Sequence, residues 1–365
     1  MVGQVDYYDL TTDLTLISII GIEDPLRPGV REAVTDCGKA GVRVKMCTGD
    51  NALTAKSIAQ HCGIYTPGGI IMEGPHFRTL SPEAMEMIVP RLQVLARSSP
   101  EDKRILVEKL RELGDVVGLT GDGTNDGPAL ETAHVGFSMG IVGTEVAEEA
   151  SDIIIMDDNF SLIVKAIISG RCVNDSVRKF LQFEISAKVT AIVITFVWAL
   201  ASSSDESPLS AVQLLWVNLI MDAFAALALA TDRASSVQLE RKPDKKTDPL
   251  FTINMIKQIL GQAIYQITMI LIFHFLGPQI LFHHTDDATL RQHHHDVVRT
   301  LVFNAFVFAQ IFNSFNCRRL DSKLNVFEGV TKNRYFMVVT AIGSSPRARL
   351  CRDVNAFRQR LLYKC

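Results

Sequence analysis

The sequence predicts an α/β unit built on a parallel sheet, followed by a bundle of helices that cross a membrane. Before Arg178, short apolar runs alternate with amphipathic helical stretches, which is typical of a parallel sheet with helices on both faces. After Arg178, four segments are apolar over close to the roughly 20 residues that a helix needs to cross a bilayer. This division explains how 47% hydrophobic and 21% charged residues coexist in one chain of 365.

In the α/β part, most strand-like runs are followed by a helix. The apolar run 14–22 predicts a buried strand, and 28–41 predicts an amphipathic helix with proline near its start and glycine at its end. The stretch 65–90, rich in glycine and proline, predicts an insertion or an irregular connection. The same reasoning predicts strands within 42–50, 93–100, 115–123, 134–139 and 152–158, and helices over 51–63, over 101–114 and from about Asn125.

The apolar part predicts a stalk helix at about Phe160–Lys179 and four membrane spans. A core helix of a soluble protein explains one such segment, but it does not explain four in succession. We therefore expect an α/β domain over 1–178, a membrane part over 179–336 and a divergent basic tail over 337–365. The predicted spans are Phe183–Ala201, Leu209–Ala230, Met255–Phe275 and Val297–Phe315.

Charge in the links between spans indicates the orientation. The loop 231–253 contains five lysines and arginines, whereas the link 202–208 contains none. By the positive-inside rule, the α/β domain and the loop 231–253 are expected to be cytoplasmic. The net charge of −3 argues against a nucleic-acid partner. No two of the seven cysteines are spaced as CxxC, which is typical of thiols in a reducing compartment.

The string TGDGTNDGPAL, from Thr120 to Leu130, is the most specific motif. It puts Asp122 at the carboxyl end of a predicted strand and Asp126 at the start of a helix. Ligands collect at such strand ends in open parallel sheets. Two carboxylates can converge there on one Mg²⁺, which also takes waters and a phosphate oxygen. A simple Asp-Gly turn explains the glycines of this string but not its acidic residues.

A second string, MCTGDN, ends another predicted strand in the same way. Thr48 and the amides that follow it lie at a predicted helix N-terminus, which is a natural cradle for phosphate. Lys103 follows a further predicted strand and can neutralise phosphate charge, with Arg97 nearby. For Lys103 alone, a solvated helix face is the favoured interpretation.

These strings resemble the P-type ATPases. DPLRPGV, MCTGDN, ARSSPEDK, TGDGTNDGPAL and SVRKFLQF occur in the family's order and spacing, and VQLLWVNLIMDAFAALALATD resembles the plasma-membrane and vacuolar calcium pumps, especially fungal ones. The resemblance implies a haloacid-dehalogenase-like (Rossmannoid) phosphorylation domain followed by an α-helical transmembrane bundle. It also implies Mg²⁺ and ATP as cofactors, Ca²⁺ as transported ion, and a vacuolar or plasma membrane as location.

The resemblance assigns roles to individual residues. Asp122 and Asp126 match the family's Mg²⁺ ligands, and Asn125 lies beside the phosphoryl group. The residues expected to contact phosphate or nucleotide, or to line that site, are Thr48, Gly49, Asp50, Arg97, Lys103, Asp24 and Arg27.

The chain also departs from the family. The DKTGT string with the phosphorylated aspartate does not occur, so no catalytic nucleophile is assigned. We expect the C-terminal portion of a pump, inactive alone, with membrane lipid, ATP, Ca²⁺ and the missing N-terminal part of the pump as partners. Two alternatives are a non-catalytic relic and a membrane-tethered haloacid-dehalogenase phosphatase. The latter is weak because Asp9, Asp13 and Asp24 lack a DxxGT context.

Ionisable residues within the predicted spans indicate an ion path. Asp222 lies in the second span, with Asn218 one turn earlier on the same face. By resemblance, these two residues match calcium ligands. Lys188 stands in the first span where an asparagine ligand is typical, and a lysine only donates hydrogen bonds. It can pair with Asp222 or with Glu184, so we expect weak or absent Ca²⁺ binding.

Overall fold

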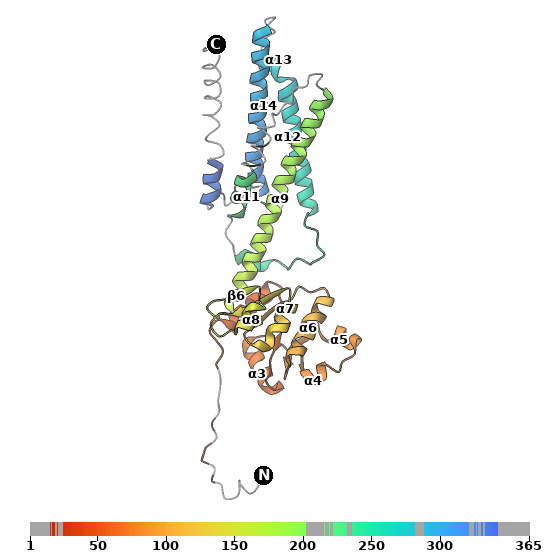
Figure 1. Ribbon diagram of the computed structural model, residues 1–365, viewed down its shortest axis with the longest axis vertical. Coiled ribbons are helices and arrows are strands. Elements are labelled where there is room, and N and C mark those ends of the chain that lie inside the picture. The colour runs from red at the N-terminus through yellow and green to blue at the C-terminus, as the bar shows by residue number, and fades with distance from the viewer. Residues whose placement is uncertain are drawn as a thin grey trace. The chain divides into compact units, whose positions relative to one another are not determined.

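The computed structural model describes residues 25–201, 222–231, 236–281, 288–320 and 333–341, with a few single residues between 15 and 330. The chain divides into two compact units. One is an α/β unit of residues 1–38 and 43–161, and the other is a helical unit of residues 39–42 and 162–365 (Figure 1).

The strands of the α/β unit are all paired in parallel, as the sequence predicts. The described strands form two three-stranded sheets, of order β1-β3-β2 and β4-β5-β6. The register pairs Met46 with Val94 in the first sheet and Thr120 with Phe137 in the second. The strands are β1 (Met46–Cys47), β2 (Ile70–Glu73), β3 (Leu92–Ala96), β4 (Gly118–Gly121), β5 (Val135–Met139) and β6 (Ile153–Ile155).

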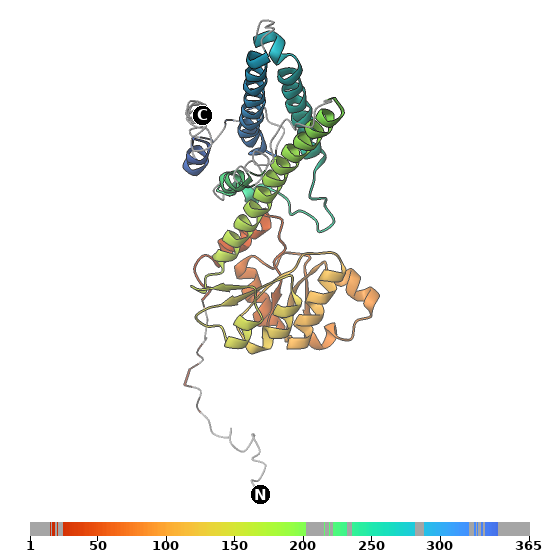
Figure 2. The same cartoon turned by 45° about the horizontal axis from the view of Figure 1, so that its top comes forward.

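Helices cover both faces of the first sheet (Figures 1 and 2). Along β3, Leu95 packs into a cluster with residues of α4, α5 and α6, whereas Val94 and Ala96 pack against α3 on the other face. This follows from the period of two in a strand, because successive side chains point to opposite faces. The helices are α2 (Val30–Lys39), α3 (Ala52–Cys62), α4 (Gly74–Phe77), α5 (Pro82–Ile88), α6 (Pro100–Glu112), η1 (Thr124–Asp126), α7 (Gly127–Thr132) and α8 (Glu145–Glu149).

Two sequence-based expectations for this unit are wrong. The stretch 65–90 is not irregular, because it contains β2, α4 and α5. Half-buried Ile70, Ile71 and Met72 pair with β3 there, and α5 packs its Met85 into the core. The run 14–22 is not a strand at its described residues, where Ile17 and Ile20 are 94% and 80% exposed. A strand needs a hydrogen-bonding partner, and these residues have none among the described strands.

Lys45, just before β1, makes the stability of the α/β unit depend on pH. Its ammonium donates to the carbonyls of Val89 (2.9 Å) and Leu92 (2.5 Å). Burial, and secondly the nearby Arg43, lowers the pKa of Lys45 to about 8. Between that value and its ordinary pKa of about 10.4, the unfolded chain binds more protons than the folded one. The free energy of unfolding therefore rises with pH across this window.

We expect this rise in wild type and its loss in Lys45→Met. The measurement is denaturant unfolding of the full chain at several pH values from about 7.5 to 10.5, which bracket the two pKa values. Lys56→Met, on exposed surface, is the matched control and should keep the wild-type slope. Equal slopes in wild type and Lys45→Met would show that the buried ammonium does not cause the effect.

The helical unit contains three helices that are long and apolar enough to cross a membrane in the described part of the chain. The spans are Ser161–Leu200, Ile253–Phe275 and Val297–Cys317. The first lies in α9 (Ser161–Ala201), which joins the predicted stalk and first span in one helix of 41 residues. The predicted second span lies mostly outside the described residues, and its end forms α11. The helices of this unit are α9, α11 (Asp222–Ala230), η3 (Ser236–Glu240), α12 (Ile253–Phe275), α13 (Gly277–Leu281) and α14 (Ala288–Cys317).

The basic loop after α11 is held against the base of α9 by charged groups. Arg241 forms an ion pair with Asp175 of α9 at 2.7 Å. Arg171 of α9 donates to the carbonyls of Gln238 and Arg241, both at 2.7 Å. Part of the basic charge of this loop is therefore neutralised by α9. Residues 342–365 of the predicted tail lie outside the described residues, and residues 333–341 include a short helical stretch.

Candidate phosphate and cation sites

Three strand ends of the α/β unit carry the predicted phosphate-site residues. Thr48, Gly49 and Asp50 follow β1, Arg97 follows β3, and Asp122 follows β4. Because β1 and β3 are parallel neighbours, their carboxyl ends meet at one edge, where the amide of Arg97 donates to the carbonyl of Asp50 at 2.8 Å. Polar groups from segments about 50 residues apart are thus brought together.

An ion pair joins η1, which follows β4, to α6, which follows β3. The Lys103 ammonium of α6 lies 2.6 Å from Asp126 Oδ1 of η1, and the side chains are only 16% and 12% exposed. A largely buried charge of this kind is held in place by its partner. Lys103 is therefore not a solvated surface lysine, and it lies where it can meet the charge of a ligand at Asp126.

The two candidate Mg²⁺ ligands differ in their surroundings. Asp126 is buried, and its Oδ2 accepts a weak hydrogen bond from the Gly123 amide at 3.4 Å. A Cβ on Gly121 would lie 2.5 Å from Asp126 Cβ, so only glycine leaves room for this carboxylate. Asp122 is exposed, and among the described residues its carboxylate has no hydrogen-bond partner.

This donor set fits Mg²⁺. The described residues contain no group of three or more metal-ligating side chains, so no closed protein cage for a metal is found among them. Mg²⁺ needs only one or two carboxylates, and it completes its shell with waters and phosphate oxygens. The pair Asp122 and Asp126 meets that requirement, with one carboxylate fixed and one open.

The loop after β1 is ordered by its own side chains. The Thr48 hydroxyl donates to Asp50 Oδ2 at 3.0 Å, and the Asp50 amide donates to Thr48 Oγ1 at 3.1 Å. Asn51 caps α3 by accepting from the amides of Leu53 and Thr54. Two amides of this helix N-terminus are therefore already bonded. Fewer amides remain to bind phosphate there than the sequence predicts.

Arg97 has a left-handed backbone conformation with φ of 44°, which is uncommon for a residue with a side chain. Its guanidinium is 60% exposed, with Glu73 of β2 at 3.9 Å. The turn that follows is anchored by buried Asp102, which accepts from the Ser99 amide at 2.8 Å and pairs with Arg78 at 2.8 Å. The anchored turn presents Arg97 at the strand end and directs α6 so that Lys103 reaches Asp126.

Other predicted site residues lie elsewhere. Arg27 donates to the carbonyl of Asp158 at 3.0 Å, after β6, and among the described residues its side chain makes no hydrogen bond or ion pair with another predicted phosphate-site residue. Asn125 lies exposed in η1. Asp24 and Asn218 lie outside the described residues. Cys47 ends β1, and burial raises the pKa of its thiol to about 11, so it is not an activated nucleophile at neutral pH.

In the helical unit, Lys188 lies between two carboxylates. Its ammonium is 3.1 Å from Glu184 Oε1, one turn earlier on α9, and 3.4 Å from Asp222 Oδ2 at the start of α11. Both pairings that the sequence allows are thus present together. Asp222 is 18% exposed, and one oxygen of Glu184 is buried without a hydrogen-bond partner among the described residues.

A set of buried amides and hydroxyls between α9, α12 and α14 was not predicted as functional. Asn313 donates to Ser186 Oγ at 2.6 Å, and Gln310 donates to Gln266 Oε1 at 2.8 Å. All four residues are at most 1% exposed. In the sequence, Gln310 and Asn313 only interrupt an apolar segment. Their spacing of three residues, which puts both on one helix face, is the signal that could have indicated a polar interior.

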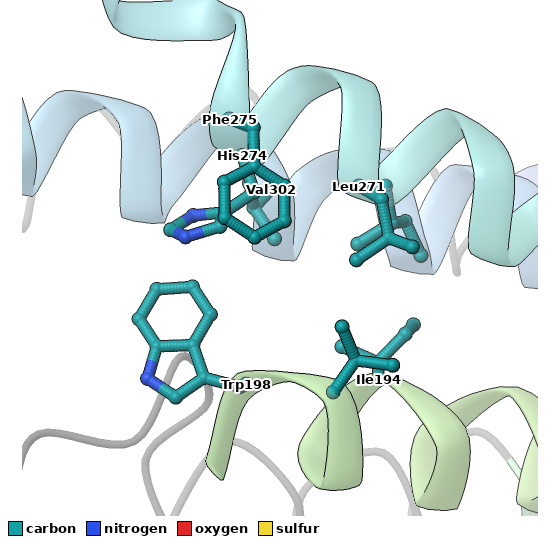
Figure 3. Close-up of a pocket in the computed structure, with 8 residues that line it drawn as sticks. Ile194, Trp198, Leu271, His274, Phe275 and Val302 are labelled. Carbon is teal, nitrogen blue, oxygen red and sulfur yellow. The ribbon is translucent and has the colours of Figure 1, made fainter. Parts of the chain in front are cut away.

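A small cavity lies further along the same three helices. The rings of Trp198 and His274, which line it, pack against each other with their centroids 3.8 Å apart (Figure 3). Its other lining residues are apolar, and its volume of about 10 Å³ is barely that of one water molecule. The cavity is therefore a packing defect of the bundle and not a ligand site.

Comparison with known proteins agrees with this architecture. Residues 3–134 match the haloacid dehalogenase-like hydrolases, and residues 206–345 match the C-terminus of cation transporting ATPases. Together with the parallel sheets and the apolar helices, these matches show that the chain belongs to the P-type cation-transporting ATPases.

The similar proteins are calcium-transporting ATPases. The chain is 63% identical to "Calcium-transporting ATPase 2" of Cryptococcus neoformans over 93% of its length and 55% identical to the protein of that name in Schizosaccharomyces pombe over 93%. It is 49% identical to "Calcium-transporting ATPase PAT1" of Dictyostelium discoideum over 92%. The chain spans only 24%, 26% and 32% of these three proteins, respectively.

Proposed function

We propose that this chain supplies the Mg²⁺- and phosphate-binding region and part of the ion path of an ATP-driven calcium pump. The observation that carries the proposal is the Lys103–Asp126 pair at 2.6 Å, which joins α6 to η1, the short helix that follows the open carboxylate of Asp122 in the chain. A fixed carboxylate, an open carboxylate and a buried lysine form a site for a phosphate group and its divalent cation. The similarity to calcium-transporting ATPases supports Ca²⁺ as the transported ion.

In this proposal, each group has a separate task. Asp122 and Asp126 hold Mg²⁺, which supplies charge neutralisation for a transferring phosphoryl group. Lys103 then adds positive charge at the phosphate, while Thr48 and the exposed amide of Gly49 bind its oxygens. Arg97 and Asp50, at the ends of β3 and β1, and Asn125, in η1, contact phosphate or nucleotide. Arg27 and Asp24 are proposed to line the site, and the guanidinium of Arg27 donates to the carbonyl of Asp158.

The membrane part carries the transport step of the proposal. Asn218 and Asp222 form part of the cation path, and occupancy of either site biases a conformational equilibrium that both share. The chain is a multi-pass protein of a vacuolar or plasma membrane, with lipid around its apolar helices. The α/β domain is on the cytoplasmic side, because the basic loop 231–253 follows the positive-inside rule.

Divalent-cation binding by the full chain tests the phosphate site. Mn²⁺ serves as the probe for Mg²⁺, because free Mn²⁺ gives an electron paramagnetic resonance signal that decreases on binding. We expect Asp122→Asn to weaken Mn²⁺ binding about tenfold or more while leaving thermal unfolding without Mn²⁺ unchanged, because this carboxylate has no described partner. Glu131→Gln, an exposed acid on α7, is the matched control and should bind as wild type does. Equal binding by Asp122→Asn and wild type would contradict the proposal.

A second candidate is a non-transporting member of the family. The observation that favours it is the contact between Lys188 and Asp222 at 3.4 Å, which gives the proposed cation ligand a resident partner. Calcium binding by variants of Lys188 distinguishes the two candidates, as described next.

A further inference from the structure

The charged triad of Glu184, Lys188 and Asp222 lies in the part of the helical unit that is expected to be inside the membrane. Two carboxylates and one ammonium leave a net charge of −1. The ammonium contacts both acids, at 3.1 and 3.4 Å, so the triad is already a compact ionic cluster. Intramembrane charges persist only when they are paired, and Lys188 provides that pairing.

A calcium ion at Asp222 conflicts with Lys188 in this position. Calcium–oxygen distances are about 2.3–2.6 Å, so with Nζ 3.4 Å from Asp222 Oδ2, an ion bound to that oxygen lies at most about 6 Å from the ammonium. The triad would then carry a net charge of +1 in a medium that screens charge poorly. Lysine offers only donors, so it cannot relieve the conflict by becoming a ligand.

The side chain of Lys188 is nevertheless able to move. It is 42% exposed in the helical unit, and its second partner, Glu184, is on its own helix at i−4. The ammonium can therefore leave Asp222 while keeping Glu184, which returns the Asp222 carboxylate to an incoming cation. Cation binding at Asp222 therefore breaks the Lys188–Asp222 contact, and the Lys188 ammonium stays close to the bound cation.

We propose that Lys188 is a tethered competitor of the transported cation at Asp222, which makes this a low-affinity site for Ca²⁺. This inference rests on the proposed function, because it specifies the cation affinity of the same ion path. Lys188 is thus a specificity-determining residue that acts through its charge.

Equilibrium binding of radioactive Ca²⁺ to the full chain in nanodiscs of neutral lipid tests the inference. Lys188→Asn replaces the ammonium by an oxygen donor and should bind Ca²⁺ at least about 100-fold more tightly than wild type. Lys188→Arg keeps the charge and should bind as weakly as wild type. The gain in Lys188→Asn should disappear in Lys188→Asn combined with Asp222→Asn, because the competition is for that carboxylate.

Several results would overturn the inference. Wild type binding Ca²⁺ as tightly as Lys188→Asn would show that the ammonium does not compete. An increase in Ca²⁺ affinity in Lys188→Arg would also contradict it. So would an increase in Lys188→Asn that persists when Asp222→Asn is added. Mn²⁺ binding at Asp122 is measured in the same preparations. An absence of Mn²⁺ binding would count against the proposed phosphate site only. The phosphate-site proposal and the Lys188 inference can therefore be contradicted separately.

Discussion

Replacing Asp126 by alanine is expected to lower the free energy of unfolding of the α/β unit by about 3–5 kcal/mol. The cost arises because Lys103 then keeps a positive charge in a site where its side chain is only 16% exposed. Lys103→Met should lower the free energy of unfolding by a similar amount, since it leaves the buried carboxylate of Asp126 without its ion-pair partner. The double variant Lys103→Met with Asp126→Leu should cost less than the sum, because it removes both charges together.

Urea unfolding of the full chain, with hydrogen exchange followed in peptides from β4 and α6, measures these changes locally. Asp115→Ala is the matched control. It breaks the Arg43–Asp115 pair, whose side chains are 57% and 39% exposed, and should cost less than about 1 kcal/mol. Equal effects of Asp115→Ala and Asp126→Ala would show that the Lys103–Asp126 pair is not a buried ion pair.

Gly121→Ala is expected to weaken Mn²⁺ binding about tenfold or more, although it leaves every proposed ligand in the sequence. The added Cβ would lie 2.5 Å from Asp126 Cβ and 2.8 Å from Oδ2, so the carboxylate must move from its position. Gly123→Ala is the matched control, because the nearest atom to its Cβ is 3.8 Å away. The electron paramagnetic resonance titration used for Asp122→Asn measures both variants.

The Gly121→Ala result shows whether Mn²⁺ binding depends on the position of the Asp126 carboxylate, because this variant keeps every proposed ligand. If Gly121→Ala bound Mn²⁺ as wild type does, Asp126 would not be the fixed carboxylate of the site. If Gly123→Ala lost binding to the same extent, the loss would reflect general disturbance of the turn. We expect a difference between the two glycines, because an added Cβ would clash with Asp126 at Gly121 only, whereas at Gly123 it would lie 3.9 Å from Asp126 Oδ2.

Much of the architecture follows from the sequence. The alternation of apolar runs and helices predicts the parallel strands, and the TGD strings predict which strand ends carry polar groups. The stretch 65–90 could not be predicted in this way. Its glycines and prolines indicate a loop, whereas β2 forms there because Ile71 and Met72 pair with a strand about 20 residues further along the chain. Long-range pairing of this kind overrides local propensity.

Other features depend on geometry that no sequence pattern contains. The polar first half and apolar second half of α9 look like a stalk and a span, but the backbone continues as one helix of 41 residues. The motif TGDN suggests free amides at the start of α3, whereas the Asn51 side chain occupies two of them. The sequence offers Lys188 two alternative partners, and the packing of α11 near α9 gives it both.

Asp122 and Asp126 are proposed to hold one divalent cation beside Lys103. A crystal structure of the full chain grown with Mn²⁺ and inorganic phosphate, with anomalous scattering collected for manganese, tests it most directly. We expect one anomalous peak within about 2.3 Å of an oxygen of each carboxylate, with phosphate between the metal and the Lys103 ammonium. A fully occupied peak elsewhere in the α/β unit, with no density between these two carboxylates, would contradict the claim.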